Sequence, residues 1–259
     1  MASSKPKDLA PQRWEQLRGI LSQNRVVRVE ELTEKLGVSS ATIRRDLGEL
    51  EKLGELRRVY GGAVSTGGRL DEPLFDDKTA VAATQKRRIA QAAAKLVKPN
   101  DTIYLDGGST VLELARLLKD RTNINIVTNS LRAAAELAGR GPRLILVGGE
   151  LRRLAQTTVG PLTRFLIQEL HVDKAFMGTI GLSLEEGLTT TDPTEAYTKE
   201  LVMEHAREVI LLADSSKAHK VSFTRAGGLD KIHVLITDEQ VDRKFAKALN
   251  KRGIEVVRA

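Results

Sequence analysis

Apolar residues near the start of the chain recur every three or four positions, which is the spacing of amphipathic helices. They form three segments, with apolar faces at Trp14, Leu17, Ile20 and Leu21, at Val29, Leu32 and Leu36, and at Ile43, Leu47, Leu50 and Leu53. Gly37 and Gly54 are suitable ends for the second and third segments, and Ser39 or Ser40 is a suitable N-cap for the third. The pattern predicts three helices within residues 1–62.

The pattern changes after the third segment. Leu56 and Val59 alternate with polar residues, and the pair Gly61–Gly62 follows, which predicts a short β-hairpin beside the helices. Residues 63–80 are rich in glycine, aspartate and small polar residues, a composition typical of a linker. We therefore expect an N-terminal domain at 1–62 and a linker at 63–80.

Residues 81–259 alternate helical patterns with short runs of valine, isoleucine and leucine. A helical stretch at 84–97 precedes the first run, and the runs lie at 102–105, 124–128, 143–147, 173–177, 208–212 and 232–237. Such runs, separated by helices, are typical of a parallel sheet covered on both faces. We expect an α/β domain with a Rossmann-like, mostly parallel sheet.

Composition narrows the class of protein. The chain has 259 residues, a net charge of +7, 41% hydrophobic residues and no cysteine. It therefore has no disulfides and no thiolate metal site, and we expect neither a metal nor a cofactor. The first residues lack the apolar region of a secretory signal, and no apolar run approaches the roughly 20 residues that cross a bilayer. These features predict a cytoplasmic protein with no membrane partner.

The third helical segment has a polar face that suits DNA. When Ile43, Leu47 and Leu50 are buried, the opposite side presents Ala41, Arg44 and Arg45. Small and basic residues allow a helix to enter the major groove, where arginine binds guanine or phosphate. Hydroxyls at the helix N-terminus suit a phosphate oxygen. The candidate DNA-binding residues are Ser39, Ser40, Ala41, Thr42, Arg44 and Arg45, with Arg57 and Arg58 on the hairpin as a wing.

The same segment supports a less specific interpretation, because an arginine pair on a helix is also typical of a solvated face. The motif around it is more informative. The stretch VRVEELTEKLGVSSATIRRDLGELEKLGELRRVYGGAV, within residues 13–64, resembles the signature of the DeoR family of bacterial transcription regulators. The resemblance implies a winged helix-turn-helix that binds operator DNA, in a homo-oligomer that pairs two half-sites.

Several strand ends in the second half carry residues that suit an anionic ligand. Glycines followed by hydroxyls at a helix N-terminus favour phosphate, and polar residues at the carboxyl ends of parallel strands share one edge of the sheet. Each loop alone is more often a tight turn, but four similar loops together predict a phosphorylated small-molecule site. The candidates are Asp106, Gly107, Gly108, Ser109, Thr110, Asn129, Ser130, Glu150, Arg152 or Arg153, and Lys217.

The resemblance continues through DGGST, TNS, GGE, DKAFMG and DSSK, which follow the order of the DeoR-type sensor domain. That domain is similar in fold to ribose-5-phosphate isomerase and the CoA transferases, and the family's effectors are typically phosphorylated sugars. The resemblance implies effector contacts from Asp106, Gly108, Ser109, Thr110, Asn129, Ser130, Arg152 and Lys217. Residues 187–199 resemble a segment that closes over the ligand, which adds Glu195 and Lys199.

Three functions remain to be compared. The first is a transcriptional regulator, a repressor of a carbohydrate-catabolism operon, which dissociates from or binds DNA according to its effector. The second is a sugar-phosphate isomerase or CoA transferase, with Asp106, Glu150 or Glu195 as a base. The third is an RNA-binding or architectural protein, which the aromatic content of 3% disfavours because few rings are available for stacking. We favour the regulator, because an isomerase has no use for a DNA-binding domain.

Overall fold

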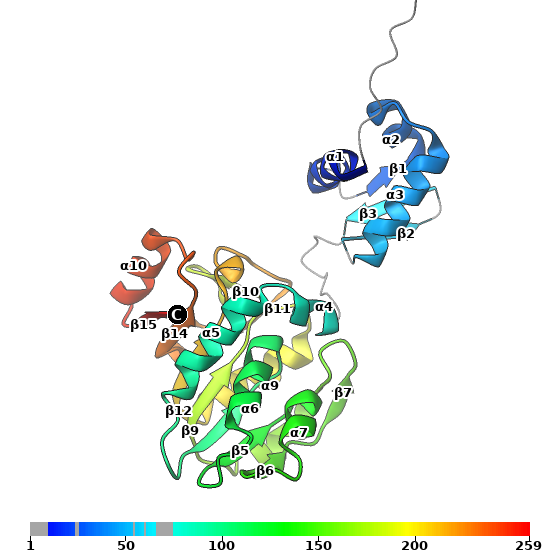
Figure 1. Ribbon diagram of the computed structural model, residues 1–259. Coiled ribbons are helices and arrows are strands. Elements are labelled where there is room, and N and C mark those ends of the chain that lie inside the picture. Colours follow the sequence, from blue (N-terminus) through cyan, green and yellow to red (C-terminus); the bar gives the residue numbers. More distant parts are fainter. Residues whose placement is uncertain (1–9, 24–25, 54, 60, 66–74) are drawn as a thin grey trace, which may run out of the picture. The chain divides into compact units, whose positions relative to one another are not determined.

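The computed structural model describes residues 10–23, 26–53, 55–59, 61–65 and 75–259 (Figure 1). The chain divides into two compact units, Met1–Asp71 and Glu72–Ala259. The expected helix stop at Gly54 lies outside the described residues.

The first unit contains the three predicted helices and the predicted hairpin. The elements are α1 (Ala10–Gln23), β1 (Val26–Arg28), α2 (Val29–Leu36), α3 (Ser40–Lys52), β2 (Leu56–Val59) and β3 (Gly62–Ser65). The sheet has the order β1-β3-β2 and is antiparallel. The short strand β1 has no signal in the sequence pattern. The predicted apolar faces form one core, in which Leu17, Leu32 and Ile43 have no exposed surface. This arrangement confirms the winged helix-turn-helix.

The second unit is built on a seven-stranded parallel sheet of order β15-β14-β12-β9-β4-β5-β6. Its strands are β4 (Thr102–Leu105), β5 (Asn125–Thr128), β6 (Arg143–Leu146), β9 (Val172–Met177), β12 (Ala206–Leu212), β14 (Val234–Thr237) and β15 (Glu255–Arg258). Six of these strands match the predicted apolar runs, which confirms the α/β class. The edge strand β15 was not predicted.

Helices cover both faces of this sheet, and Figure 1 shows α5, α6 and α7 along one of them. One core joins the sheet to α5 (Ala83–Ala94), α6 (Ser109–Leu118) and α7 (Leu131–Leu137). The core on the other face includes residues of α8 (Arg164–Ile167), α9 (Pro193–Glu204) and α10 (Arg243–Lys251). Buried strands between two helical layers read as continuous apolar runs, which is why the sequence pattern located them.

Two small antiparallel sheets extend this unit. The hairpin of β7 (Glu150–Arg152) and β8 (Thr157–Val159) follows β6. A second sheet has the order β10-β11-β13, with β10 at Gly181–Ser183, β11 at Gly187–Thr190 and β13 at Thr224–Gly227. Neither sheet was predicted, because its strands lack the continuous apolar runs that mark the buried parallel strands. No helix in the described part of the chain is long and apolar enough to cross a bilayer.

The expected linker at 63–80 needs correction at both ends. Strand β3 continues to Ser65, and residues Phe75–Ala80 form the helix α4 of the second unit. Phe75 is buried, and the guanidinium of Arg132 on α7 lies 5.7 Å from the centre of its ring. The polar composition of Phe75–Ala80 gives no apolar period that marks this helix in the sequence. Residues 66–74 lie outside the described part.

Candidate functional site

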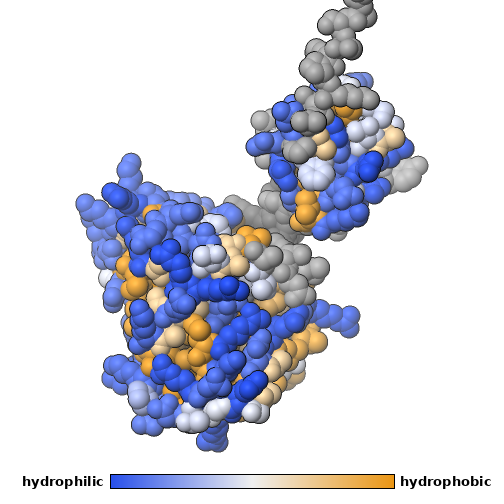
Figure 2. Space-filling view, in the orientation of Figure 1, coloured by the Kyte–Doolittle hydropathy of each residue, from blue (hydrophilic) through white to orange (hydrophobic). Residues whose placement is uncertain are grey.

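Helix α3 buries its apolar side and exposes the predicted basic side. Ile43, Leu47 and Leu50 are buried, whereas Arg44 and Arg45 are exposed. Ser39, Ser40 and Ala41 are also exposed, and Thr42 is half-buried. The outward direction of both arginines is therefore confirmed. In the view of Figure 2, the surface of this unit is largely hydrophilic, with scattered apolar positions.

The start of α3 is capped by the predicted serine pair. Ser39 is the N-cap, and its hydroxyl accepts a hydrogen bond from the backbone N–H of Thr42 at 3.3 Å. The hydroxyl oxygens of Ser39 and Thr42 are 2.9 Å apart. Ser40 is the first helical residue. This arrangement leaves the helix N-terminus and both hydroxyls at the surface, where an anion is stabilised by the N–H groups.

A buried ion pair fixes α1 against α3. The Nε of Arg13 lies 2.5 Å from the Oδ2 of Asp46, and the indole N–H of Trp14 donates to Oδ1 at 3.0 Å. Burial alone would raise the pKa of Asp46, but the hydrogen bonds from Arg13 and Trp14 outweigh burial and hold this pKa below its usual value. Asp46 therefore stays ionised and holds α3 at a defined angle.

The hairpin β2–β3 carries Arg57 and Arg58, which were expected to form a wing. Val59 pairs with Gly62, so the turn is tight. The carbonyl of Gly61 accepts from the N–H of Val29 at 2.9 Å, which places the turn against the start of α2. The side chain of Arg58 is exposed, and that of Arg57 lies outside the described part.

The carboxyl ends of three neighbouring strands bring polar groups together in the second unit. Asp106 follows β4, Asn129 follows β5 and Gly178 follows β9. Asp106 is 3% exposed, and its Oδ2 accepts from the N–H of Gly178 at 2.9 Å and from the Nζ of Lys199. Lys199 also donates to the carbonyl of Gly178 at 3.1 Å. The loops after β4 and β5 lie at the same edge of the sheet, as predicted, whereas the contribution of the loop after β9 was not predicted.

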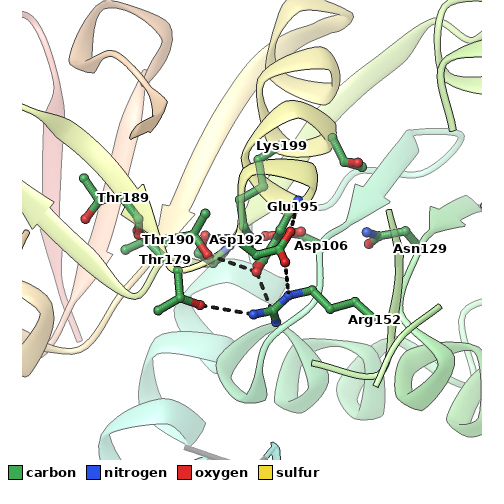
Figure 3. Close-up of polar contacts among 12 residues, drawn as sticks. Asp106, Asn129, Arg152, Thr179, Thr189, Thr190, Asp192, Glu195 and Lys199 are labelled. Carbon is green, nitrogen blue, oxygen red and sulfur yellow. Dashed lines mark hydrogen bonds and ion pairs between the residues drawn. The ribbon is translucent and has the colours of Figure 1, made fainter. Parts of the chain in front are cut away.

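A charged network extends from Lys199 to the β7–β8 hairpin (Figure 3). Glu195 lies 3.4 Å from the Nζ of Lys199 and 3.3 Å from a guanidinium nitrogen of Arg152. Arg152 also lies 3.4 Å from Asp192 and donates to Thr191 at 3.1 Å. Burial opposes the charge of Lys199, but Asp106 and Glu195 overcome it and raise the pKa of Lys199. Lys199 is therefore a permanent cation between two carboxylates.

The first turn of α6 lies beside this network. Gly108 precedes the helix with a φ of +132°, a conformation that favours glycine, and Ser109 and Thr110 are 7% and 8% exposed. A Cβ on Gly107 would lie 2.2 Å from the Cγ2 of Thr157, so only glycine fits there. The Oδ1 of Asn129 and the hydroxyl of Thr157 are buried with no hydrogen-bond partner among the described residues. A buried acceptor without a hydrogen-bond partner costs free energy of folding, and such acceptors are typical of a ligand-binding site.

Four predicted residues are not among the groups described above, namely Glu150, Arg153, Lys217 and Ser130. Glu150 is exposed at the start of β7, and Arg153 is exposed directly after the end of this strand. Lys217 is half-buried in the turn after β12, where burial lowers its pKa and its charged neighbours include Asp214, Lys220 and Lys78. Ser130 has a structural role, because its hydroxyl caps α7 by accepting from the N–H of Ala133 at 3.3 Å.

Four residues of the site were not predicted from the sequence, namely Thr157, Gly178, Thr191 and Asp192. Asp192 caps α9 by accepting from the N–H groups of Thr194 and Glu195, each at 2.9 Å. Its signal was present, because aspartate before proline marks a helix start. Thr157 had no comparable signal, since its position depends on how the β7–β8 hairpin folds back over Gly107.

Two family models match the chain, one in each unit. Residues 13–67 match the family described as "DeoR-like helix-turn-helix domain", and residues 81–239 match "DeoR C terminal sensor domain". The transcriptional regulator GlpR of Haloferax volcanii is 38% identical over 88% of this chain and 90% of its own length. The lactose phosphotransferase system repressor of Streptococcus mutans is 37% identical over 91% and 95%. Ribose 5-phosphate isomerase A of Methanocaldococcus jannaschii has a TM-score of 0.39 at 23% identity, over 51% of this chain and 53% of that chain.

Proposed function

Because the chain belongs to the DeoR family of transcriptional regulators, we propose that α3 binds an operator half-site and that a phosphorylated sugar in the second unit controls this binding. The protein is a DNA-binding regulator and not an enzyme. The observation that carries the effector proposal is the position of the α6 N-terminus beside buried, unpartnered acceptors and a charged network.

On the DNA side, each exposed residue of α3 has a separate role. Arg45 reads a guanine in the major groove, because arginine donates two hydrogen bonds to O6 and N7. Ser39, Ser40 and Thr42 bind a backbone phosphate at the helix N-terminus, and Ala41 permits close approach. Arg44 and the hairpin arginines contact the flanking backbone. Two half-sites require two readers, so the protein binds DNA as a homo-oligomer.

In the second unit, the phosphate and the sugar of the effector contact different groups. The phosphate lies at Gly108, Ser109 and Thr110, where backbone N–H groups and hydroxyls donate to it. The sugar hydroxyls donate to Asp106 and to the Oδ1 of Asn129. Arg152, Glu195 and Lys199 close the site from the β7–β8 hairpin and α9. Lys217 is a further candidate for the phosphate end, because it follows β12 at the same edge of the sheet.

The route from effector to DNA runs through α4. This helix is the first described element after the linker, and Phe75 packs against Arg132 of α7. A cavity of about 300 Å³ between α4, α6 and α7 is lined partly by Phe75, Leu112 and Arg132. Helices α6 and α7 begin at the effector loops and line this cavity together with α4. A ligand that shifts the first turns of α6 and α7 therefore also shifts α4, the helix that follows the linker. An effector controls DNA binding only if it prefers one arrangement of the protein.

A thermal-shift screen of the full-length protein tests this proposal. The panel contains hexose, pentose and triose phosphates, the corresponding free sugars and inorganic phosphate. We expect one phosphorylated sugar to raise the melting temperature, because a ligand at 100 times its Kd stabilises the folded state by about 2.7 kcal/mol. The same compound must then change the affinity for operator DNA in a mobility-shift titration. Stabilisation by the free sugars alone would exclude a phosphate site.

A further inference from the structure

Arg58 of β2 lies against the recognition helix. Its backbone N–H donates to the Oε1 of Glu51 on α3 at 2.7 Å. A Cβ built on Gly48 would lie 3.6 Å from an Nη of Arg58, so the guanidinium lies directly beside this glycine. Because Gly48 has no side chain, nothing on α3 separates the guanidinium from the helix backbone. The glycine therefore makes room for Arg58 on the surface of α3.

Arg44 lies on the same edge of the helix. Residues four apart are neighbours on a helix surface, so Arg44 and Gly48 are adjacent. Arg44 and Arg58 line one cavity of about 390 Å³, together with Val29, Glu30, Leu47, Gly61 and Gly62. Both arginine side chains are exposed. The cavity thus has two cations at its α3 and β2 sides, and its acidic residue, Glu30, comes from α2.

The hairpin is held against its own unit. Beyond the bond between Gly61 and Val29, a Cβ on Gly62 would lie 2.1 Å from the carbonyl oxygen of Val27, so the two backbones are in close contact. This packing fixes the position of the wing within its own unit. It also keeps Arg58 on the flank of α3.

We propose that Gly48 positions Arg58, and that Arg44 and Arg58 together bind one phosphate of the duplex backbone. This inference rests on the proposed function and makes it more specific. Two guanidinium groups around one cavity match the several acceptor oxygens of a phosphate. The carboxylate of Glu30 repels the anion and keeps it at the arginine end.

The test uses the full-length protein and a 30-base-pair duplex that the wild type selects from a randomised pool. Binding is titrated at several salt concentrations. For Arg58→Ala we expect about a tenfold loss of affinity for the selected duplex and a similar loss for a random duplex, because a phosphate contact is independent of sequence. The salt slope, which is the decrease of log K with the logarithm of the salt concentration, should be lower by about one. Arg58→Lys keeps the slope, since it keeps the charge.

Matched substitutions at Gly48 test the positioning. Gly48→Leu fills the space beside α3 and should reproduce the loss seen for Arg58→Ala, whereas Gly48→Ala adds a Cβ at ordinary contact distance and should bind as the wild type does. The double variant Gly48→Leu with Arg58→Ala should be no weaker than Arg58→Ala alone, because the leucine acts only through the arginine.

Separate outcomes contradict the two proposals. An unchanged salt slope in Arg58→Ala, or losses from Gly48→Leu and Arg58→Ala that simply add, would show that Arg58 only supports the fold. Failure to select any duplex would instead contradict the proposed function. Thermal unfolding of each variant shows whether a loss of DNA affinity comes from unfolding of the protein. If Arg58→Ala is unfolded, Arg58→Lys tests the phosphate contact instead, because its salt slope is measured on a folded protein.

Discussion

Lys199 and Asp106 form a buried ion pair at the centre of the proposed effector site, although 93 positions separate them in the sequence. Each side chain is 4% exposed. The pair joins α9 to the carboxyl end of β4, so it links the segment 187–199 to the loop before α6. Glu195, one helical turn before Lys199, extends the pair toward Arg152.

Breaking this pair should destabilise the second unit strongly. Lys199→Met leaves Asp106 as a buried charge without its cation, and we expect a loss of about 3–5 kcal/mol in the free energy of unfolding. Urea unfolding followed by circular dichroism measures this loss. The double variant Asp106→Asn with Lys199→Met should recover most of it, since no unpaired charge remains. Equal stability of Lys199→Met and the wild type would show that the pair is solvated.

Arg45 should carry sequence-specific binding. Arg45→Ala removes a guanine contact, and we expect specific affinity to fall by about 1–3 kcal/mol in a mobility-shift titration, with less preference for the cognate base. Lys251→Ala is the control, because it removes one exposed positive charge from α10 in the other unit. Unchanged specific affinity in Arg45→Ala would contradict the placement of α3 in the groove.

Ser109 should affect the response to the effector and leave DNA binding intact. Its hydroxyl lies in the first turn of α6, and a hydrogen bond to a charged ligand is worth about 1.5–3 kcal/mol. Ser109→Ala should therefore need at least about tenfold more effector to change operator affinity. Thr122→Ala, at an exposed loop position, serves as a control that responds as the wild type does. A variant at Ser109 with a normal response would place the phosphate elsewhere.

Lys86 predicts a pH dependence of stability. Its ammonium donates to the carbonyls of Lys78 and Val81 at the end of α4, and burial lowers its pKa from 10.5 to about 8. Between these two values the unfolded chain binds the proton more tightly than the folded protein does. Stability attributable to Lys86 therefore rises with pH from about 8 to 10.5, at a limiting slope of about 1.4 kcal/mol per pH unit.

Urea unfolding at pH 7.5, 8.5 and 9.5 measures this slope. Lys86→Met should remove the rise in stability with pH. Lys95→Met replaces an exposed lysine just after α5, the helix that contains Lys86, and should keep the rise. A slope that is the same in Lys86→Met and the wild type would show that another group titrates in this range.

Regular periodicity made much of the fold predictable from sequence. The buried faces of α1, α2 and α3 and six of the seven parallel strands follow from the spacing of apolar residues, because burial on one face of a helix or inside a two-sided sheet leaves a distinct pattern. The outward direction of Arg44 and Arg45 follows from the burial of Ile43 and Leu47 on the opposite side. Capping by Ser39 follows from local backbone chemistry.

Only the tertiary structure decided which strand ends share a site and which side chains complete it. Asp106, Lys199 and Arg152 belong to one network for two reasons. Helix α9 brings Lys199 to the carboxyl end of β4, and the β7–β8 hairpin places Arg152 against Glu195 of the same helix. Gly48 beside Arg58 and Thr157 beside Gly107 are likewise contacts between distant segments. Periodicity reports the environment of each residue along its own element, whereas partners across the fold depend on topology, and topology leaves no local pattern.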